Sequence, residues 1–80
     1  MHTEELLRQR LQSARTKLNW AIQQVLKINK SRKRMQSELQ DNHLLENVQR
    51  FLNILLKHLN DFIRKQAYLL SIYENALLEL

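Results

Sequence analysis

The second half of the chain carries an apolar pattern that is wider than a single helix contact requires. Two columns repeat every seven residues and form a seam like that of packed helices: the first holds Leu45, Leu52, Leu59, Tyr73 and Leu80 and is broken by Gln66, and the second holds Val48, Leu55, Phe62, Leu69 and Ala76. A third column lies beside this seam and holds Leu56, Ile63, Leu70 and Leu77, while the other edge carries Leu44, Phe51 and Ile72. A two-stranded coiled coil needs two apolar positions per heptad, so the pattern predicts a helix that contacts more than one other helix.

The first half of the chain follows a narrower version of the same pattern. Its apolar residues recur in alternating steps of four and three, at Leu7, Leu11, Ala14, Leu18, Ala21, Val25, Ile28, Met35 and Leu39, with Arg32 filling one place. This spacing predicts one amphipathic helix, with Thr3 as its N-cap and Glu4 and Glu5 in its first turn. Ala14 and Ala21 stand where the second half has Leu and Phe, so small residues should face large ones.

A break in register separates the two halves. The apolar set that ends at Leu39 resumes at Leu45 with its phase shifted by one residue, and Asp41 or Asn42 can cap a new helix between them. We therefore expect an all-α antiparallel helical hairpin in one domain, 1–80, with a helix over 3–39, a turn over 40–43 and a helix over 44–80. One continuous helix in a long parallel coiled coil is the competing interpretation, and the register break argues against it.

Composition supports helices and limits the other classes. The 80 residues include no Gly, Pro or Cys, which excludes disulfides and thiolate metal sites, and 44% are apolar, which excludes a disordered polar tail. The apolar runs are far shorter than the roughly 18 residues that a membrane span needs, and the start does not resemble a signal peptide. A cytoplasmic location is the expectation, and a membrane role for the basic first helix is the less favoured one.

The apolar excess predicts association. In an isolated hairpin the third column of residues 56–77 would face water, and each fully buried apolar side chain is worth about 1.5–3 kcal/mol. A homodimer of hairpins forming a four-helix bundle would cover this surface, and so would another helical protein. Gln66 interrupts the core column; its amide can pair locally near Lys17 or Leu18, or with itself across a two-fold axis. Arg32 can cover apolar surface with its stem while its guanidinium reaches water, or can pair with a partner.

Charge is concentrated in the first helix. Residues 1–40 hold nine Lys or Arg against three acids, a balance of +6, and residues 41–80 hold four against five, a balance of −1. Lys27, Lys30, Lys33 and Arg34 form a basic patch that could bind nucleic acid or an acidic partner. A solvated surface is the favoured interpretation, because no aromatic residues alternate with these basic ones. Trp20, which lies just off the seam, can be a rim contact or an anchor for a partner.

No pattern of catalytic residues is present. His2, His43 and His58 lack metal-ligand spacing, and neither a Ser–His–Asp set nor a Gly-rich phosphate loop occurs. We expect no enzyme activity, no cofactor and no metal. The sequence predicts a protein–protein interaction module, such as a small adaptor, a chaperone-like protein or an oligomerisation subunit. Its interaction face would be Leu56, Ile63, Leu70, Leu77, Phe51, Ile72 and Gln66. A bundle that binds RNA or DNA through the basic first helix is the alternative.

Overall fold

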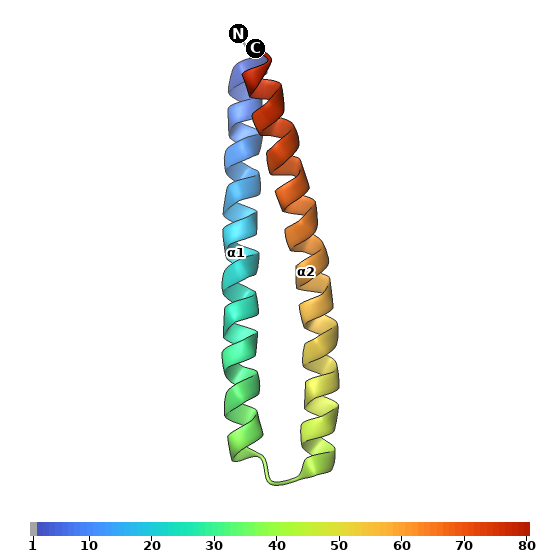
Figure 1. Ribbon diagram of the computed structural model, residues 1–80. Helices are drawn as coiled ribbons and strands as arrows, with labels where there is room; N and C mark the ends of the chain where they lie inside the picture. Colours follow the sequence, from blue (N-terminus) through green and yellow to red (C-terminus); the bar gives the residue numbers. More distant parts are fainter. Residues whose placement is uncertain (1) are drawn as a thin grey trace.

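The computed structural model describes residues 2–80 and consists of two long antiparallel helices (Figure 1). Helix α1 spans His2–Glu38, helix α2 spans Asn42–Leu78, and three residues connect them. The predicted all-α hairpin is thus confirmed, and the helix bounds differ from the predicted ones by one or two residues. The molecule measures 60 × 15 × 15 Å, and its radius of gyration of 18.0 Å exceeds the roughly 12 Å of a globular domain of this length.

The start of α1 differs from the sequence prediction. The helix begins at His2, so Thr3 lies inside the first turn and is not the N-cap. Water can satisfy the free N–H groups of an exposed first turn, so no capping side chain is required at Thr3. Glu4 and Glu5 occupy this turn as expected, and Glu4 accepts a hydrogen bond of 2.9 Å from Arg8 one turn later.

The start of α2 follows the prediction. Asp41 is the N-cap with extended backbone angles (φ −83°, ψ 105°), and its carboxylate accepts from the backbone N–H groups of His43 at 3.0 Å and Leu44 at 3.3 Å. These bonds satisfy two of the amides that a helix start leaves free. No residue among 2–80 has a positive φ, so the connection turns the chain without the left-handed conformation that would favour glycine.

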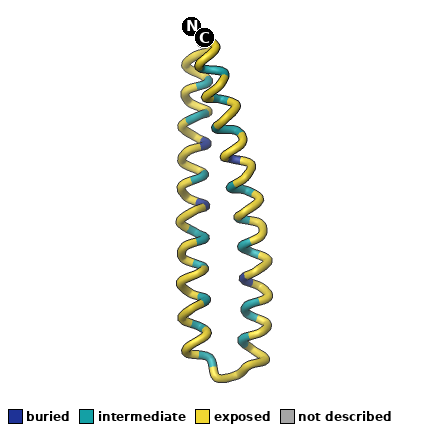
Figure 2. The backbone as a smooth tube through the Cα atoms, viewed as in Figure 1, coloured by how far each residue is buried: buried dark blue, intermediate teal, exposed yellow. Residues whose placement is uncertain are grey.

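The seam between the helices holds the expected residues. Ala14, Ala21, Leu52 and Gln66 are buried, and the remaining seam positions of both helices are half-buried, except Leu80, which is exposed. Figure 2 shows that these positions line the facing sides of α1 and α2. The alanines on α1 face the larger residues of α2, as the sequence indicated. Leu80 follows the end of α2 and therefore has no helix opposite it.

Arg32 connects the two helices near the hairpin turn. Its Nη2 donates a hydrogen bond to the Asn53 side-chain oxygen on α2, while its Nε is buried without a partner. The stem covers the seam as expected. The guanidinium, however, is engaged within the chain, because Asn53 lies directly opposite it on α2.

Candidate functional site

Contacts between the helices define two long faces of the hairpin. On one face Arg15 of α1 pairs with Glu74 of α2 at 3.5 Å. Glu74 stands one helical turn from both Leu70 and Leu77, so the third apolar column lies on this side of the seam. Ile22 and Leu26 follow Arg15 on the same shoulder of α1. We call this surface the Leu70 face, and it consists of Ile22, Leu26, Leu56, Ile63, Leu70 and Leu77.

The Leu70 face is only partly exposed. Its four α2 residues are half-buried, whereas the α1 members Ile22 and Leu26 are 39% and 57% exposed. The expectation that the α2 column faces water was therefore too strong. This column stands next to the seam, so α1 shelters one side of each residue. What remains is a shallow apolar strip to which both helices contribute.

The opposite face carries aromatic residues. Trp20 of α1 meets Phe62 of α2 edge to face, with ring centroids 6.3 Å apart and planes at 81°, yet Trp20 is still 56% exposed. Leu44, Phe51 and Ile72 belong to a column on the Phe62 side of α2 and are 48%, 61% and 41% exposed. We call Trp20, Leu44, Phe51 and Ile72 the Trp20 face. Phe51 and Ile72, which the sequence grouped with the interaction residues, thus lie across the seam from the Leu70 face.

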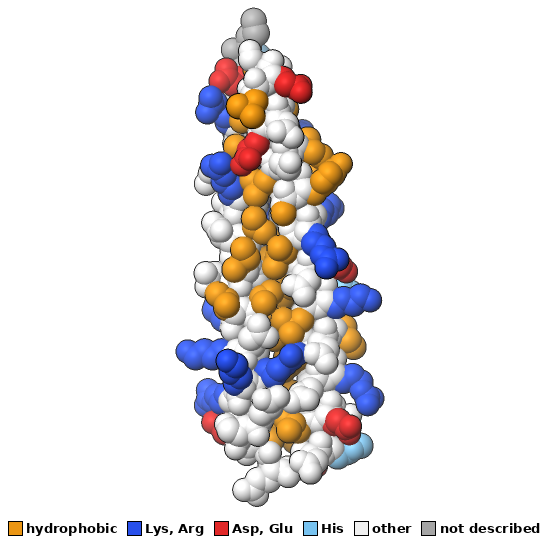
Figure 3. All heavy atoms as spheres, in the orientation of Figure 1, with side chains coloured by type: hydrophobic (Ala, Val, Ile, Leu, Met, Phe, Trp, Pro, Cys, Tyr) orange, Lys and Arg blue, Asp and Glu red, His pale blue; other side chains and the backbone are white. Residues whose placement is uncertain are grey.

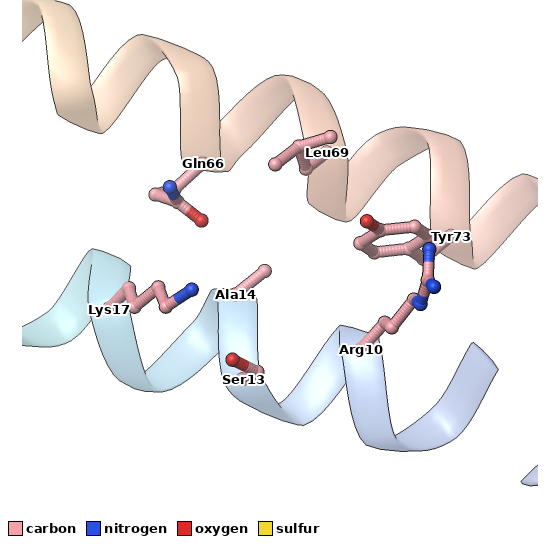
Figure 4. A pocket seen from close by; sticks show the side chains of 7 residues that line it. All are labelled: Arg10, Ser13, Ala14, Lys17, Gln66, Leu69 and Tyr73. Carbon is pink, nitrogen blue, oxygen red and sulfur yellow. The ribbon is translucent and has the colours of Figure 1, made fainter. Parts of the chain in front are cut away.

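A cleft opens along the seam on the Trp20 side (Figure 4). It has a volume of about 150 Å³ and is lined by Arg10, Ser13, Ala14, Lys17, Gln66, Leu69 and Tyr73. Gln66 is 5% exposed and lies opposite α1 beside Lys17, the place that the local-pairing interpretation indicated. Sequence reasoning did not single out Arg10 or Ser13, and it placed Tyr73 in the seam without predicting a cleft there. The i, i+3, i+7 spacing of Arg10, Ser13 and Lys17 is the signal that could have identified this shoulder of α1.

The basic patch lies on α1 in the half nearer the connection. Lys27, Lys30 and Lys33 are exposed, and none forms an ion pair with any residue among 2–80. Arg34 is engaged by Glu38 one turn later, at 3.1 Å. An exposed pair of this kind contributes about 0–1 kcal/mol, so Arg34 stays available to an external anion. The structure therefore brings the four basic residues to one end of α1.

The face of the hairpin that Figure 3 shows combines an apolar band with charged side chains. Figure 3 shows apolar side chains in a band along the junction of the helices, with Lys and Arg on both sides of it. Neither α1 nor α2 contains a stretch apolar enough to cross a membrane. Within residues 2–80, no three His, Asp or Glu side chains are grouped so that they could hold a metal ion.

The fold defines the class of the protein as a two-helix hairpin with apolar strips on both long faces. Comparison with family models, with curated proteins and with solved structures finds no match for this chain.

Proposed function

We propose that this protein is a non-enzymatic interaction module and that the Leu70 face pairs with a second copy to form an antiparallel four-helix bundle. The observation that carries the proposal is the lack of a self-sufficient core. The hydrophobic core is confined to Ala14, Ala21 and Leu52, and no large side chain among residues 2–80 is fully buried. Small domains of this length rarely stabilise themselves with so little buried surface.

The solvent-accessible surface area of the hairpin also indicates that its core is incomplete. The chain exposes 6609 Å² at 9.7 kDa. A compact monomer of that mass exposes about 5,100 Å², so the hairpin carries roughly 1,500 Å² in excess. A compact dimer of the same chain would bury up to about 4,700 Å² in total, which falls within the range of obligate homodimers. Such a dimer would bury roughly 2,350 Å² per chain, which is more than the excess of roughly 1,500 Å² that each chain carries.

Two-fold pairing suits the Leu70 face in particular. Apolar residues at seven-residue intervals on α2 and the shoulder residues Ile22 and Leu26 on α1 form one continuous strip. A two-fold interface uses the same patch twice, so a strip with the same chemistry along its length is self-complementary. Knobs-into-holes packing of such strips is the geometry of four-helix bundles.

Paired glutamates at Leu56 and Leu70 test the proposal. The variant Leu56→Glu with Leu70→Glu should reduce the mass in solution from that of two chains to that of one, because each dimer would bury four carboxylates. The control Asn47→Glu with Ser71→Glu adds the same charge at exposed positions away from the strip and should leave the mass unchanged. Light scattering gives the mass, and circular dichroism checks that the chain stays helical.

A second variant tests the same face in case the glutamates at Leu56 and Leu70 unfold the hairpin. Ile22→Glu with Leu26→Glu changes only exposed members of the strip and leaves the seam intact. If both variants stay helical and keep the mass of the unmodified protein, the Leu70 face is not the interface. If that mass is the mass of two chains, the copies pair through another surface, and the Trp20 face is the next one to test.

Nucleic-acid binding through the basic patch is the alternative function. The observation in its favour is that Lys27, Lys30 and Lys33 have no ion-pair partner within the chain. Phosphates could supply that partner, with a strong dependence on salt. Reversing the charges of Lys27, Lys30, Lys33 and Arg34 should abolish RNA or DNA binding but leave the mass of the dimer unchanged, so the two functions are separable.

A further inference from the structure

We propose that the cleft on the Trp20 side of the seam binds a small oxyanion, held by Arg10, Lys17 and Gln66. This site is distinct from the proposed dimer interface, because Lys17 stands one turn from Trp20 and therefore lies across the seam from the Leu70 face. The lining residues come from both helices, so a bound ion would also bridge α1 to α2.

The charge of the cleft is positive and uncompensated. Arg10 and Lys17 both line it, and neither forms an ion pair within residues 2–80. The neighbouring arginines are engaged elsewhere, Arg8 with Glu4 and Arg15 with Glu74. No carboxylate lines the cleft, and α1 carries no acid from residue 6 to residue 37. Two cations without a local counter-charge favour an anion between them.

Gln66 supplies the second, independent observation. Its side chain is 5% exposed, and none of the side-chain hydrogen bonds within residues 2–80 involves it. The amide of a side chain buried this deeply is normally hydrogen-bonded, and because Gln66 lines the cleft, its partner is water or a ligand there. The hydroxyls of Ser13 and Tyr73 also line the cleft. Every polar side chain of the lining can thus donate a hydrogen bond, which is what an oxyanion requires.

The donor groups enter the cleft from both helices. Figure 4 shows the Lys17 ammonium and the Gln66 amide on opposite walls, while Arg10 reaches across toward the ring of Tyr73. The Tyr73 hydroxyl points into the space between the two helices. Leu69 and Ala14 complete the lining with apolar surface, which strengthens charge-assisted hydrogen bonds by excluding part of the water.

Size restricts the ligand. The volume of about 150 Å³ corresponds to roughly five water molecules. Sites for drug-sized ligands occupy about 300–1,000 Å³, so this cleft suits an ion of the size of phosphate better than a whole nucleotide. A short carboxylate shares the required chemistry.

Titration of the full-length protein with inorganic phosphate tests the site. Chloride is replaced by phosphate at constant ionic strength, and the amide resonances of Ser13 and of the Gln66 side chain are followed by NMR. We expect saturable shifts at both. Lys17→Gln and Arg10→Gln should each weaken binding by about tenfold or more, since each removes a charged donor. Lys27→Gln, which removes the same charge from the basic patch, is the matched control and should bind as the unmodified protein does.

A Gln66 variant and a second anion extend the titration. Gln66→Leu should stay folded, because Leu suits a seam position, and should lose the saturable shifts. Acetate identifies the source of the oxyanion: stronger binding of phosphate indicates a phosphate ligand, and equal or stronger binding of acetate indicates a carboxylate. The proposal is overturned if replacing chloride with phosphate produces no saturable shifts at Ser13 and Gln66, or if Lys27→Gln weakens binding as much as Lys17→Gln does. Solution mass does not enter these readouts, so their outcome is independent of the dimer.

Discussion

At the scale of single residues, the spacing of the helices depends on small side chains. Ala14 is 3% exposed and Ala21 is completely buried, and both face α2 across the seam. A larger residue at either place would have to displace the opposite helix, because packed interiors hold few voids to absorb added atoms.

Ala21→Leu should therefore destabilise the hairpin. Overpacking of a filled site costs about 1–3 kcal/mol, and chemical denaturation at a fixed protein concentration would measure it. The control is Gln23→Leu at an exposed position on the outer side of α1, where a surface change should stay within about 0.5 kcal/mol. Equal effects of the two substitutions would show that Ala21 is not at a close contact.

The residue types predicted which side chains lie in the seam better than they predicted which side chains contact each other. The position of Gln66 against α1 near Lys17 could be read from its place in the core column, and its amide proved to open into a cleft. The contact of Arg32 with Asn53 could not be foreseen, because it depends on the register of α2 against α1. Thr3 was assigned wrongly as a cap because a capping residue type also fits inside a first turn.

At the scale of elements, the start of α2 is fixed by one side chain. Asp41 accepts hydrogen bonds from two backbone amides of the first turn, and its negative charge lies at the positive end of the helix dipole. The connection contains no glycine, so this cap is the main local signal that ends one helix and begins the next.

Asp41→Ala should lower the free energy of unfolding by about 0.5–2 kcal/mol, the usual cost of a lost N-cap. Thermal or urea unfolding followed by circular dichroism measures it. Gln40→Ala is the neighbouring control, since the Gln40 side chain takes part in none of the hydrogen bonds of residues 2–80, and it should have little effect. A loss that is equal in both variants would contradict the capping role.

For the third apolar column, the sequence predicted the position on α2 but not the degree of burial. Periodicity placed Leu56, Ile63, Leu70 and Leu77 on one edge of α2, as the Arg15–Glu74 pair now supports. Periodicity could not give the exposed fraction of these side chains, because that fraction depends on how much of each one α1 covers. The structure shows them half-buried, with Ile22 and Leu26 extending the same strip.

At the scale of the whole molecule, the hairpin followed from two apolar registers separated by a one-residue phase shift. Each helix of 37 residues is about 56 Å long at 1.5 Å per residue, in agreement with the 60 Å length of the molecule. Such a rod has a high ratio of surface to volume, and its apolar strips stay open on both sides of the seam. The association that would cover one of them stays a prediction.

The mass of the purified protein in solution is the most direct test of this account. Light scattering over a range of protein concentrations, at two salt concentrations, should give the mass of two chains, about twice 9.7 kDa, with little dependence on salt because the interface is apolar. A protein that has the mass of one chain at every concentration and still unfolds cooperatively would contradict the proposed dimer.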